Sequence, residues 1–240
     1  MLGLKLKSTG ISGLDQMLGG GFPDNKIILI CGGPGSGKTI LSIQCMIEAL
    51  KRGEKCTFLT LEEPLESIKT NVSTFGWDLD GWIKKGLLKM SSIIMIPDAG
   101  SSSGRERDID PTLSLNAEII RSIVSDKPRL VVIDPLTSLV IHEPRSGKKR
   151  YLIGDLFESL RRVGCYVLVI SETSPQEGDF YMEQFLADGV LLLEKEIKDH
   201  KLTKILRIDK MRGLAYDEQP RKYGIDSKGF HVINHESIEN

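Results

Sequence analysis

A glycine-rich stretch near the start of the chain has the residue types of a phosphate-binding loop. Residues 32–39 read Gly-Gly-Pro-Gly-Ser-Gly-Lys-Thr and fit the pattern G-x-x-x-x-G-K-[ST]. Its glycines let the backbone curl so that successive N–H groups point at phosphate oxygens. In this pattern Lys38 supplies a charge for the β- and γ-phosphates, and the Thr39 hydroxyl is placed to bind Mg²⁺. The predicted nucleotide-binding residues are Gly33, Pro34, Gly35, Ser36, Gly37, Lys38, Thr39 and Ile40.

The segments on either side of this loop fit the same interpretation. Residues 26–31 form an apolar run of strand length with β-branched side chains, and residues 39–52 carry the apolar side chains of a mostly buried helix. A helix N-terminus that follows a glycine loop attracts anions, because its free N–H groups and its dipole both favour phosphate. A strand, a loop and a helix are therefore expected to form one anion site.

Acidic residues after two other predicted strands could complete this site. An apolar run ends in Asp134, which we expect to hold Mg²⁺, through a water molecule. Hydrolysis also needs a carboxylate that orients the attacking water. Pro135 follows Asp134, so the second acid is not there; Glu62 and Glu63 follow another strand, and strand ends face the ligand crevice of a parallel sheet. The alternative is that both glutamates only cap the next helix.

The composition of the chain limits the classes of protein to consider. It has 240 residues, 40% of them hydrophobic, and a formal net charge of −1. We expect one α/β domain over residues 1–240, without an overall basic field for nucleic acid. The four cysteines form no C-x-x-C pair and are expected to be buried thiols. We see neither a signal peptide nor an apolar run of about 18 residues, so a cytoplasmic location is expected.

The order of the predicted elements indicates the fold. Strands alternate with helices over the first two thirds, which favours a parallel, doubly wound sheet, whereas the later strands look antiparallel. Ser12 is expected to cap a short helix. We expect polar loops at 97–110, 142–150 and 174–178.

Several short motifs are spread over nearly the whole chain. They are Ser8-Thr9-Gly10-Ile11 with Gly13-Leu14-Asp15, Leu18-Gly19-Gly20-Gly21, Ser42-Ile43-Gln44, Glu62-Glu63-Pro64, Gly76-Trp77-Asp78 and Lys210-Met211-Arg212-Gly213. Together they resemble motifs of KaiC-type ATPases of the RecA/RadA superfamily. The chain resembles a single KaiC-type domain, similar to RadA paralogues. The resemblance implies a RecA-like P-loop NTPase core, with a mainly parallel sheet flanked by helices and antiparallel strands toward the C-terminus. It also implies binding of ATP and Mg²⁺, ATP hydrolysis with the glutamate pair as catalytic residues, and a homo-oligomeric ring or filament with nucleotide between subunits.

Lys210 and Arg212 match family residues that reach the γ-phosphate of the neighbouring subunit's ATP. In that role their charges stabilise transition-state oxygens and link hydrolysis to assembly. The alternative is two ordinary surface cations on an edge strand. The residues after this motif depart from the family, and Tyr216 could either stack on the base or serve as packing.

Two polar loops could bind single-stranded DNA, because the superfamily binds DNA on this side. One holds Arg145, Lys148, Lys149 and Arg150, and the other Gln176, Phe180 and Tyr181. Cations near aromatic rings suit phosphates and stacked bases, although solubilising charge is the alternative. His231 and His235 lack nearby acids and are expected to be surface residues.

Three functions remain open from the sequence. The first is an oligomeric ATPase in DNA recombination and repair or in regulation. The second is a nucleotide-dependent assembly module with little hydrolysis. The third is a kinase, including one that phosphorylates itself.

Overall fold

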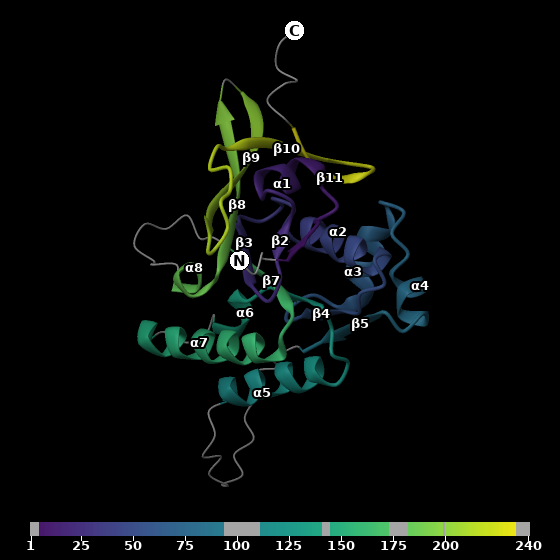
Figure 1. Cartoon of the computed structure of the whole chain (residues 1–240), viewed down its shortest axis with the longest axis vertical. Coiled ribbons are helices and arrows are strands. Elements are labelled where there is room, and N and C mark those ends of the chain that lie inside the picture. Colours follow the sequence, from purple (N-terminus) through teal and green to yellow (C-terminus); the bar gives the residue numbers. More distant parts are fainter. Residues whose placement is uncertain (1–4, 94–110, 141–144, 173–181, 199, 234–240) are drawn as a thin grey trace.

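A nine-stranded sheet forms the centre of the structure, a computed structural model that describes residues 5–93, 111–140, 145–172, 182–198 and 200–233 (Figure 1). The strand order in this sheet is β11-β10-β9-β8-β3-β7-β6-β4-β5. The strands are β3 (Ile27–Gly32), β4 (Cys56–Thr60), β5 (Leu88–Ser92), β6 (Leu130–Asp134), β7 (Tyr166–Glu172), β8 (Gly189–Lys198), β9 (Lys201–Met211), β10 (Arg221–Asp226) and β11 (Gly229–Val232). A separate two-stranded sheet pairs β1 (Leu6–Lys7) with β2 (Phe22–Pro23).

Strand direction divides the large sheet into two parts. The strands from β8 through β3, β7, β6 and β4 to β5 pair in parallel, whereas β9, β10 and β11 are antiparallel. The expected α/β class, with antiparallel strands toward the C-terminus, is confirmed. In a parallel sheet all carboxyl ends of the strands meet at one edge, and the residues predicted to bind nucleotide follow these ends.

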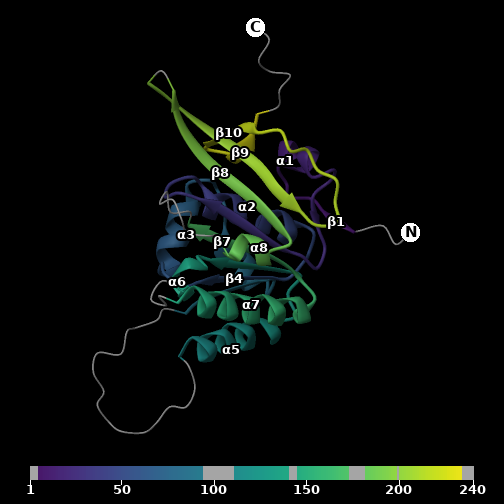
Figure 2. The ribbon, with the colours of Figure 1, turned by 90° about the vertical axis from the view of Figure 1, so that its left-hand side faces the viewer.

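Helices cover both faces of the parallel part. They are α1 (Ser12–Met17), α2 (Lys38–Lys51), α3 (Leu65–Ser73), α4 (Leu79–Lys84), α5 (Pro111–Val124), α6 (Thr137–Val140), α7 (Ser146–Val163) and α8 (Met182–Leu186). In Figure 2, α5 and α7 lie together below the sheet, and α2 lies on its other side.

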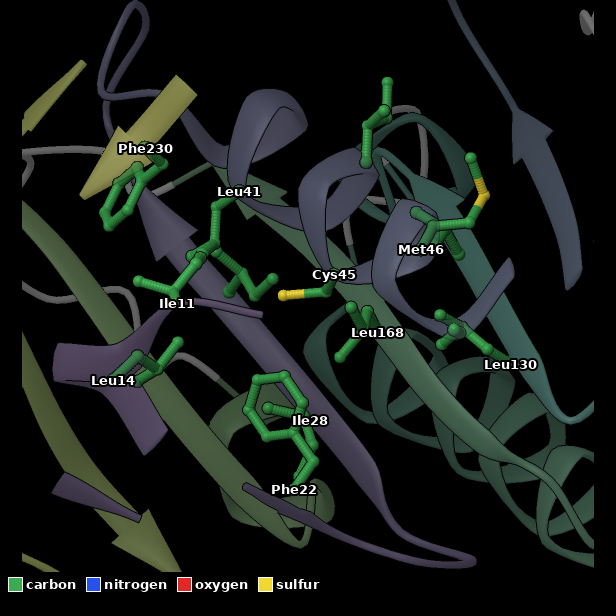
Figure 3. Packing of buried hydrophobic residues seen from close by; sticks show 14 of the residues in the cluster. Ile11, Leu14, Phe22, Ile28, Leu41, Cys45, Met46, Leu130, Leu168 and Phe230 are labelled. Atoms are coloured by element: carbon green, nitrogen blue, oxygen red, sulfur yellow. The ribbon is translucent and has the colours of Figure 1, made fainter. Parts of the chain in front are cut away.

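The alternation of side chains along the buried strands builds two hydrophobic cores. On β3, Ile28 and Ile30 join the core beneath α2, whereas Ile27 and Leu29 join the core beneath α5 and α7. Figure 3 shows the first core, in which Leu41 and Cys45 of α2 approach the strands. The continuous apolar runs of these strands follow from burial on both faces.

The structure corrects three of the sequence-based expectations. His231 does have an acid nearby, because its Nδ1 lies 3.5 Å from Asp226 Oδ2. Ser12 does not cap α1: it is the first residue of the helix, and Ile11 precedes it. Instead Asp15 accepts hydrogen bonds from the Ser8 hydroxyl (2.6 Å) and the Thr9 N–H (2.8 Å), which fixes the turn before the helix. The expected loop at 142–150 is also wrong in its second half, because α7 begins at Ser146.

Other expectations are confirmed or lie outside the described residues. All four cysteines are free and buried, as predicted. In the described ranges, no helix is both long and apolar enough to cross a membrane. The predicted loops at 97–110 and 174–178 lie wholly outside these ranges. So do His235 and three of the predicted nucleic-acid residues, Gln176, Phe180 and Tyr181.

Candidate nucleotide site

A cavity of about 710 Å³ lies at the carboxyl edge of the parallel strands. The glycine loop lines one side of it, and the ends of β4, β6 and β7 together with α3 line the rest. Its size falls within the range of pockets that hold small molecules. The cavity therefore lies outside the carboxyl ends of the parallel strands, which is where open α/β sheets bind their ligands.

The glycine loop leads from β3 into α2 as predicted. Gly37 precedes the helix in the left-handed region (φ 98°), and a Cβ at this position would lie 2.4 Å from Ile225 Cδ1. The backbone conformation therefore favours glycine here, whereas the end of the Ile225 side chain on β10 could move to admit a Cβ. The Ser36 hydroxyl is buried and has no hydrogen-bond partner among the described residues, which fits a loop that completes its bonds with a ligand.

Lys38 holds its ammonium group at the base of the loop. Its Nζ donates to the carbonyl oxygens of Gly32 (2.8 Å) and Gly33 (3.2 Å), and lies 3.9 Å from Glu172 Oε1. Burial lowers the pKa of Lys38, while Glu172 and Asp134 act against this effect. A phosphate in the cavity would add negative charge beside this buried cation, in addition to that of Glu172.

Thr39 and Asp134 come together as predicted for a metal site. The Thr39 hydroxyl donates to Asp134 Oδ2 at 2.7 Å. Burial raises the pKa of Asp134 to about 6, and the Glu63 and Glu62 carboxylates add to the rise against the Thr39 bond and Lys38. A hydroxyl and a carboxylate are oxygen ligands of the kind that Mg²⁺ prefers, so this pair fits a magnesium ion that neutralises the acid.

Glu62 and Glu63 both line the cavity, but different neighbours hold them. Glu62 Oε2 accepts a hydrogen bond from the Ser138 hydroxyl of α6 at 3.0 Å. Glu63 Oε1 accepts from the Ser67 hydroxyl and from Asn71 Nδ2 (3.1 Å), both on α3. Glu63 is therefore tied to side chains of α3, whose N-terminus has no side-chain cap, whereas Glu62 is tied to the segment after β6.

Lys210 and Arg212 lie outside the cavity of their own chain. Lys210 Nζ donates to the backbone oxygen of Gln184, and Arg212 Nη2 to that of Phe185 at 2.9 Å. Both cations thus bind the last carbonyls of α8, a favourable place for positive charge. They donate to neighbouring carbonyls of α8, and neither residue lines the cavity of its own chain.

The structure places the remaining predicted residues away from the cavity. Tyr216 donates to the Asp209 carbonyl at 3.2 Å and packs against the core, and it is not among the cavity-lining residues. Lys148, Lys149 and Arg150 lie in the first two turns of α7, directly after Arg145.

Sequence reasoning did not predict eight of the residues that line the cavity: Thr60, Pro64, Ile68, Asn71, Val72, Pro135, Glu172 and Ile225. Thr60 accepts hydrogen bonds from the backbone N–H groups of Glu62 (3.3 Å) and Glu63 (3.0 Å) and so shapes their turn. The positions of Thr60 and Glu172 at strand ends were the available signal. Asn71 and Ile225 gave none, because each reaches the cavity only through packing of a distant element.

A glycine loop at a helix N-terminus, a buried lysine and a threonine–aspartate pair define a P-loop nucleotide-binding protein. The family model described as "ATPase: KaiC" matches residues 7–237, and the chain belongs to this KaiC ATPase family. It is 33% identical to a UPF0273 protein of Thermotoga maritima over 98% of this chain and 99% of that protein. It is 29% identical to the circadian clock protein KaiC3 of Synechocystis over 99% of this chain but 47% of that protein.

A search of solved structures supports the fold. A KaiC-like protein from the archaeon Pyrococcus horikoshii superposes with a TM-score of 0.83 at 24% identity, covering 97% of this chain and all of that one. The RecA-like α/β fold expected from the sequence is confirmed.

Proposed function

We propose that this protein binds ATP together with Mg²⁺ in the cavity and hydrolyses the γ-phosphate bond. The observation that carries the proposal is the meeting of three groups in one cavity: Lys38, the Thr39–Asp134 pair and the two glutamates. Backbone N–H groups of residues 33–39 and the Lys38 ammonium would hold the phosphates. Thr39 and Asp134 would hold the magnesium ion, which supplies positive charge for the phosphate oxygens.

The glutamates supply the remaining chemistry. A carboxylate at the cavity wall accepts a hydrogen bond from water and orients it toward the γ-phosphate. Glu62 has the geometry for this role, since Ser138 holds one of its oxygens and leaves the other for water. Glu63 shares its carboxylate with two donors of α3 and supports the turn.

The protein is proposed to work as an oligomer. Proteins of the KaiC-like family generally form oligomers, and Lys210 and Arg212 lie together on one face outside their own cavity. From a neighbouring copy these cations would stabilise the negative charge of the transition state, as an arginine finger does.

Steady-state release of phosphate tests the catalytic proposal. The wild type is compared with a variant that carries Glu62→Ala and Glu63→Ala, and with Glu66→Ala, whose side chain is 84% exposed on α3. We expect a loss of at least about 100-fold in the double variant and little change in the control. Equal rates in all three proteins would remove the catalytic claim and favour the assembly module with little hydrolysis.

The kinase alternative and DNA binding have their own tests. Intact-mass analysis after incubation with ATP would show a gain of phosphate if the protein phosphorylates itself. Single-stranded DNA and recombination are left outside the proposal, because the predicted DNA loop is partly the start of α7. A salt-dependent affinity for a labelled single strand that weakens with Lys148→Ala and Lys149→Ala would bring DNA back.

A further inference from the structure

The outer half of the β8–β9 hairpin projects beyond the rest of the sheet (Figures 1 and 2). β8 pairs with β3 only as far as Leu193, and β9 pairs with β10 only at Ile205 and Leu206. In the ranges that the structure describes, no third strand lies beside residues 194–204. A two-stranded ribbon is marginally stable by itself and leaves unpaired edges, which natural proteins generally cover or protect.

The end of this ribbon carries an exposed apolar pair. Ile197 and Leu202 lie directly opposite each other on the two strands and are 80% and 58% exposed. Ile197 is the most exposed of the large apolar side chains in the described part of the chain. Cross-strand neighbours share one face of a ribbon, so the two side chains form a single apolar tip.

The apolar tip stands on the ribbon face that meets the phosphate loop. Lys195 is two residues before Ile197, so their side chains point to the same face of β8. Lys195 Nζ donates to the Pro34 carbonyl of the loop at 2.6 Å. A molecule that approaches the nucleotide from outside would therefore meet the tip of the hairpin beside the loop.

A second exposed apolar side chain lies beside the proposed fingers. Phe185 on α8 is 59% exposed, and Arg212 donates to its backbone oxygen. Eight residues of β8 at about 3.3 Å each separate the start of this strand, next to α8, from Ile197, a span of roughly 26 Å. The tip of one chain therefore cannot cover Phe185 of the same chain.

We propose that the apolar tip of one copy packs against Phe185 of the next copy, beside the nucleotide that the two copies share. This inference rests on the proposed assembly, in which Lys210 and Arg212 of one copy face the cavity of another. In such an assembly Phe185 of one copy also lies near the cavity of the other copy, because Lys210 and Arg212 are hydrogen-bonded to α8, the helix that carries Phe185. The apolar tip lies near the cavity of its own copy, because Lys195 of the hairpin is hydrogen-bonded to the phosphate loop. The contact buries two apolar surfaces that each copy leaves exposed.

Cysteine cross-linking tests which surfaces meet. The natural cysteines are all buried, so Ile197→Cys and Phe185→Cys can be labelled selectively with a short bis-maleimide in ATP and Mg²⁺. We expect covalent dimers when the two variants are mixed and none from either variant alone. A variant with both substitutions should give a ladder of higher multimers.

Three results would overturn the proposed contact. The first is that Ile197→Cys alone cross-links as efficiently as the mixture of Ile197→Cys with Phe185→Cys. The second is that the mixture gives no cross-link although the wild type assembles. The third is that the protein stays monomeric with and without ATP and Mg²⁺. The cross-link is read without reference to phosphate release, so failure of the ATPase proposal would be a separate result.

Sedimentation gives a second, independent measurement. A variant with Ile197→Ser and Leu202→Ser should assemble at least about tenfold more weakly than the wild type, since a buried aliphatic side chain is worth that much or more. Val124→Ser is the matched control, because Val124 is 50% exposed but lies at the end of α5. Calorimetry with ATP confirms that each variant is folded. Equal assembly of the tip variant and the control would contradict the contact.

Discussion

Asp134 is the side chain for which burial and chemistry conflict most. Burial raises its pKa to about 6 from an ordinary 3.8, so the folded protein binds this proton more tightly than the unfolded chain does. The ionised carboxylate therefore costs stability above pH 6, and this cost disappears as the pH falls below about 4. A bound magnesium ion would remove the cost by pairing with the charge.

Replacing Asp134 by asparagine should stabilise the protein in buffer without nucleotide or metal. From the pKa difference we expect a gain of about 3 kcal/mol in the free energy of unfolding at pH 8, and almost none at pH 3.8. Urea denaturation at the two pH values measures it. Glu218→Gln, on an exposed residue, is the control and should change little. A loss of stability of Asp134→Asn at pH 8 would contradict the claim that the ionised Asp134 carboxylate destabilises the folded protein.

The serine beside Glu62 is expected to matter for hydrolysis more than for binding. Ser138→Ala frees the Glu62 carboxylate from its only recorded side-chain partner among the described residues, so its orientation toward water is lost. We expect kcat to fall roughly 3- to 10-fold, as for one solvent-exposed hydrogen bond, with KM nearly unchanged. Ser67→Ala, which frees Glu63 instead, is the comparison and should have a smaller effect on kcat. An equal fall of kcat in Ser138→Ala and Ser67→Ala would contradict the separate roles proposed for Glu62 and Glu63.

At this scale the sequence is informative about the residues that touch phosphate and metal, because their types and spacing are fixed by chemistry. It could not predict Ser138 as the partner of Glu62. These two residues are 76 positions apart, and their contact depends on α6, a helix of four residues that is too short to show a periodic pattern.

The elements near the N-terminus depend on a close approach of two backbones. β1 pairs with β2, and Gly21 lies directly before β2 with φ 131°. A Cβ at Gly21 would lie 2.1 Å from the Lys7 backbone oxygen. The packing of this small sheet therefore explains Gly21, the last glycine of the triplet that resembles the family motif.

Gly21→Ala should destabilise the protein much more than Gly53→Ala. At Gly21 the new methyl group would push β1 away, and we expect a loss of about 3 kcal/mol in the free energy of unfolding. Gly53 also has a positive φ (76°), but its Cβ would meet nothing within 4 Å, so only backbone strain of about 1 kcal/mol is expected. Urea denaturation of both variants checks this, and equal losses would contradict it.

The helices show where sequence patterns fail. The sequence predicts a loop at the start of α7 because residues 145–150 are polar or small, and the structure leaves none of them buried. The apolar period of the helix begins only at Leu152, one turn and a half later. The buried strands, in contrast, were predictable, because burial on both faces demands continuous apolar runs.

At the scale of the whole molecule, the fold follows from the sequence but the assembly does not. The alternation of strands and helices restricts the topology, whereas contacts between copies depend on exposed side chains such as Ile197 and Phe185 that any surface could carry. The proposed oligomer combines the cavity of one copy with the cations of the next.

Mixing two inactive variants tests whether each active site is shared. Arg212→Ala keeps the glutamates but lacks the finger, and the variant with Glu62→Ala and Glu63→Ala lacks the acids but keeps Arg212. In an equal mixture about a quarter of the sites should combine intact halves, so phosphate release should recover to roughly that fraction of the wild-type rate. If the two variants assemble together but the mixture releases phosphate no faster than either variant alone, the glutamates and Arg212 do not act in one shared site.

The central claim is that the glycine loop, Lys38 and the Thr39–Asp134 pair hold a nucleoside triphosphate with magnesium. Isothermal titration of the folded protein with ATP tests it most directly, with and without Mg²⁺ and in parallel with Lys38→Ala. We predict saturable heat for one ATP per chain, tighter binding with Mg²⁺, and a loss of at least about tenfold in affinity for the variant. No heat from the wild type with ATP and Mg²⁺, or equal affinity of the wild type and Lys38→Ala, would contradict the account.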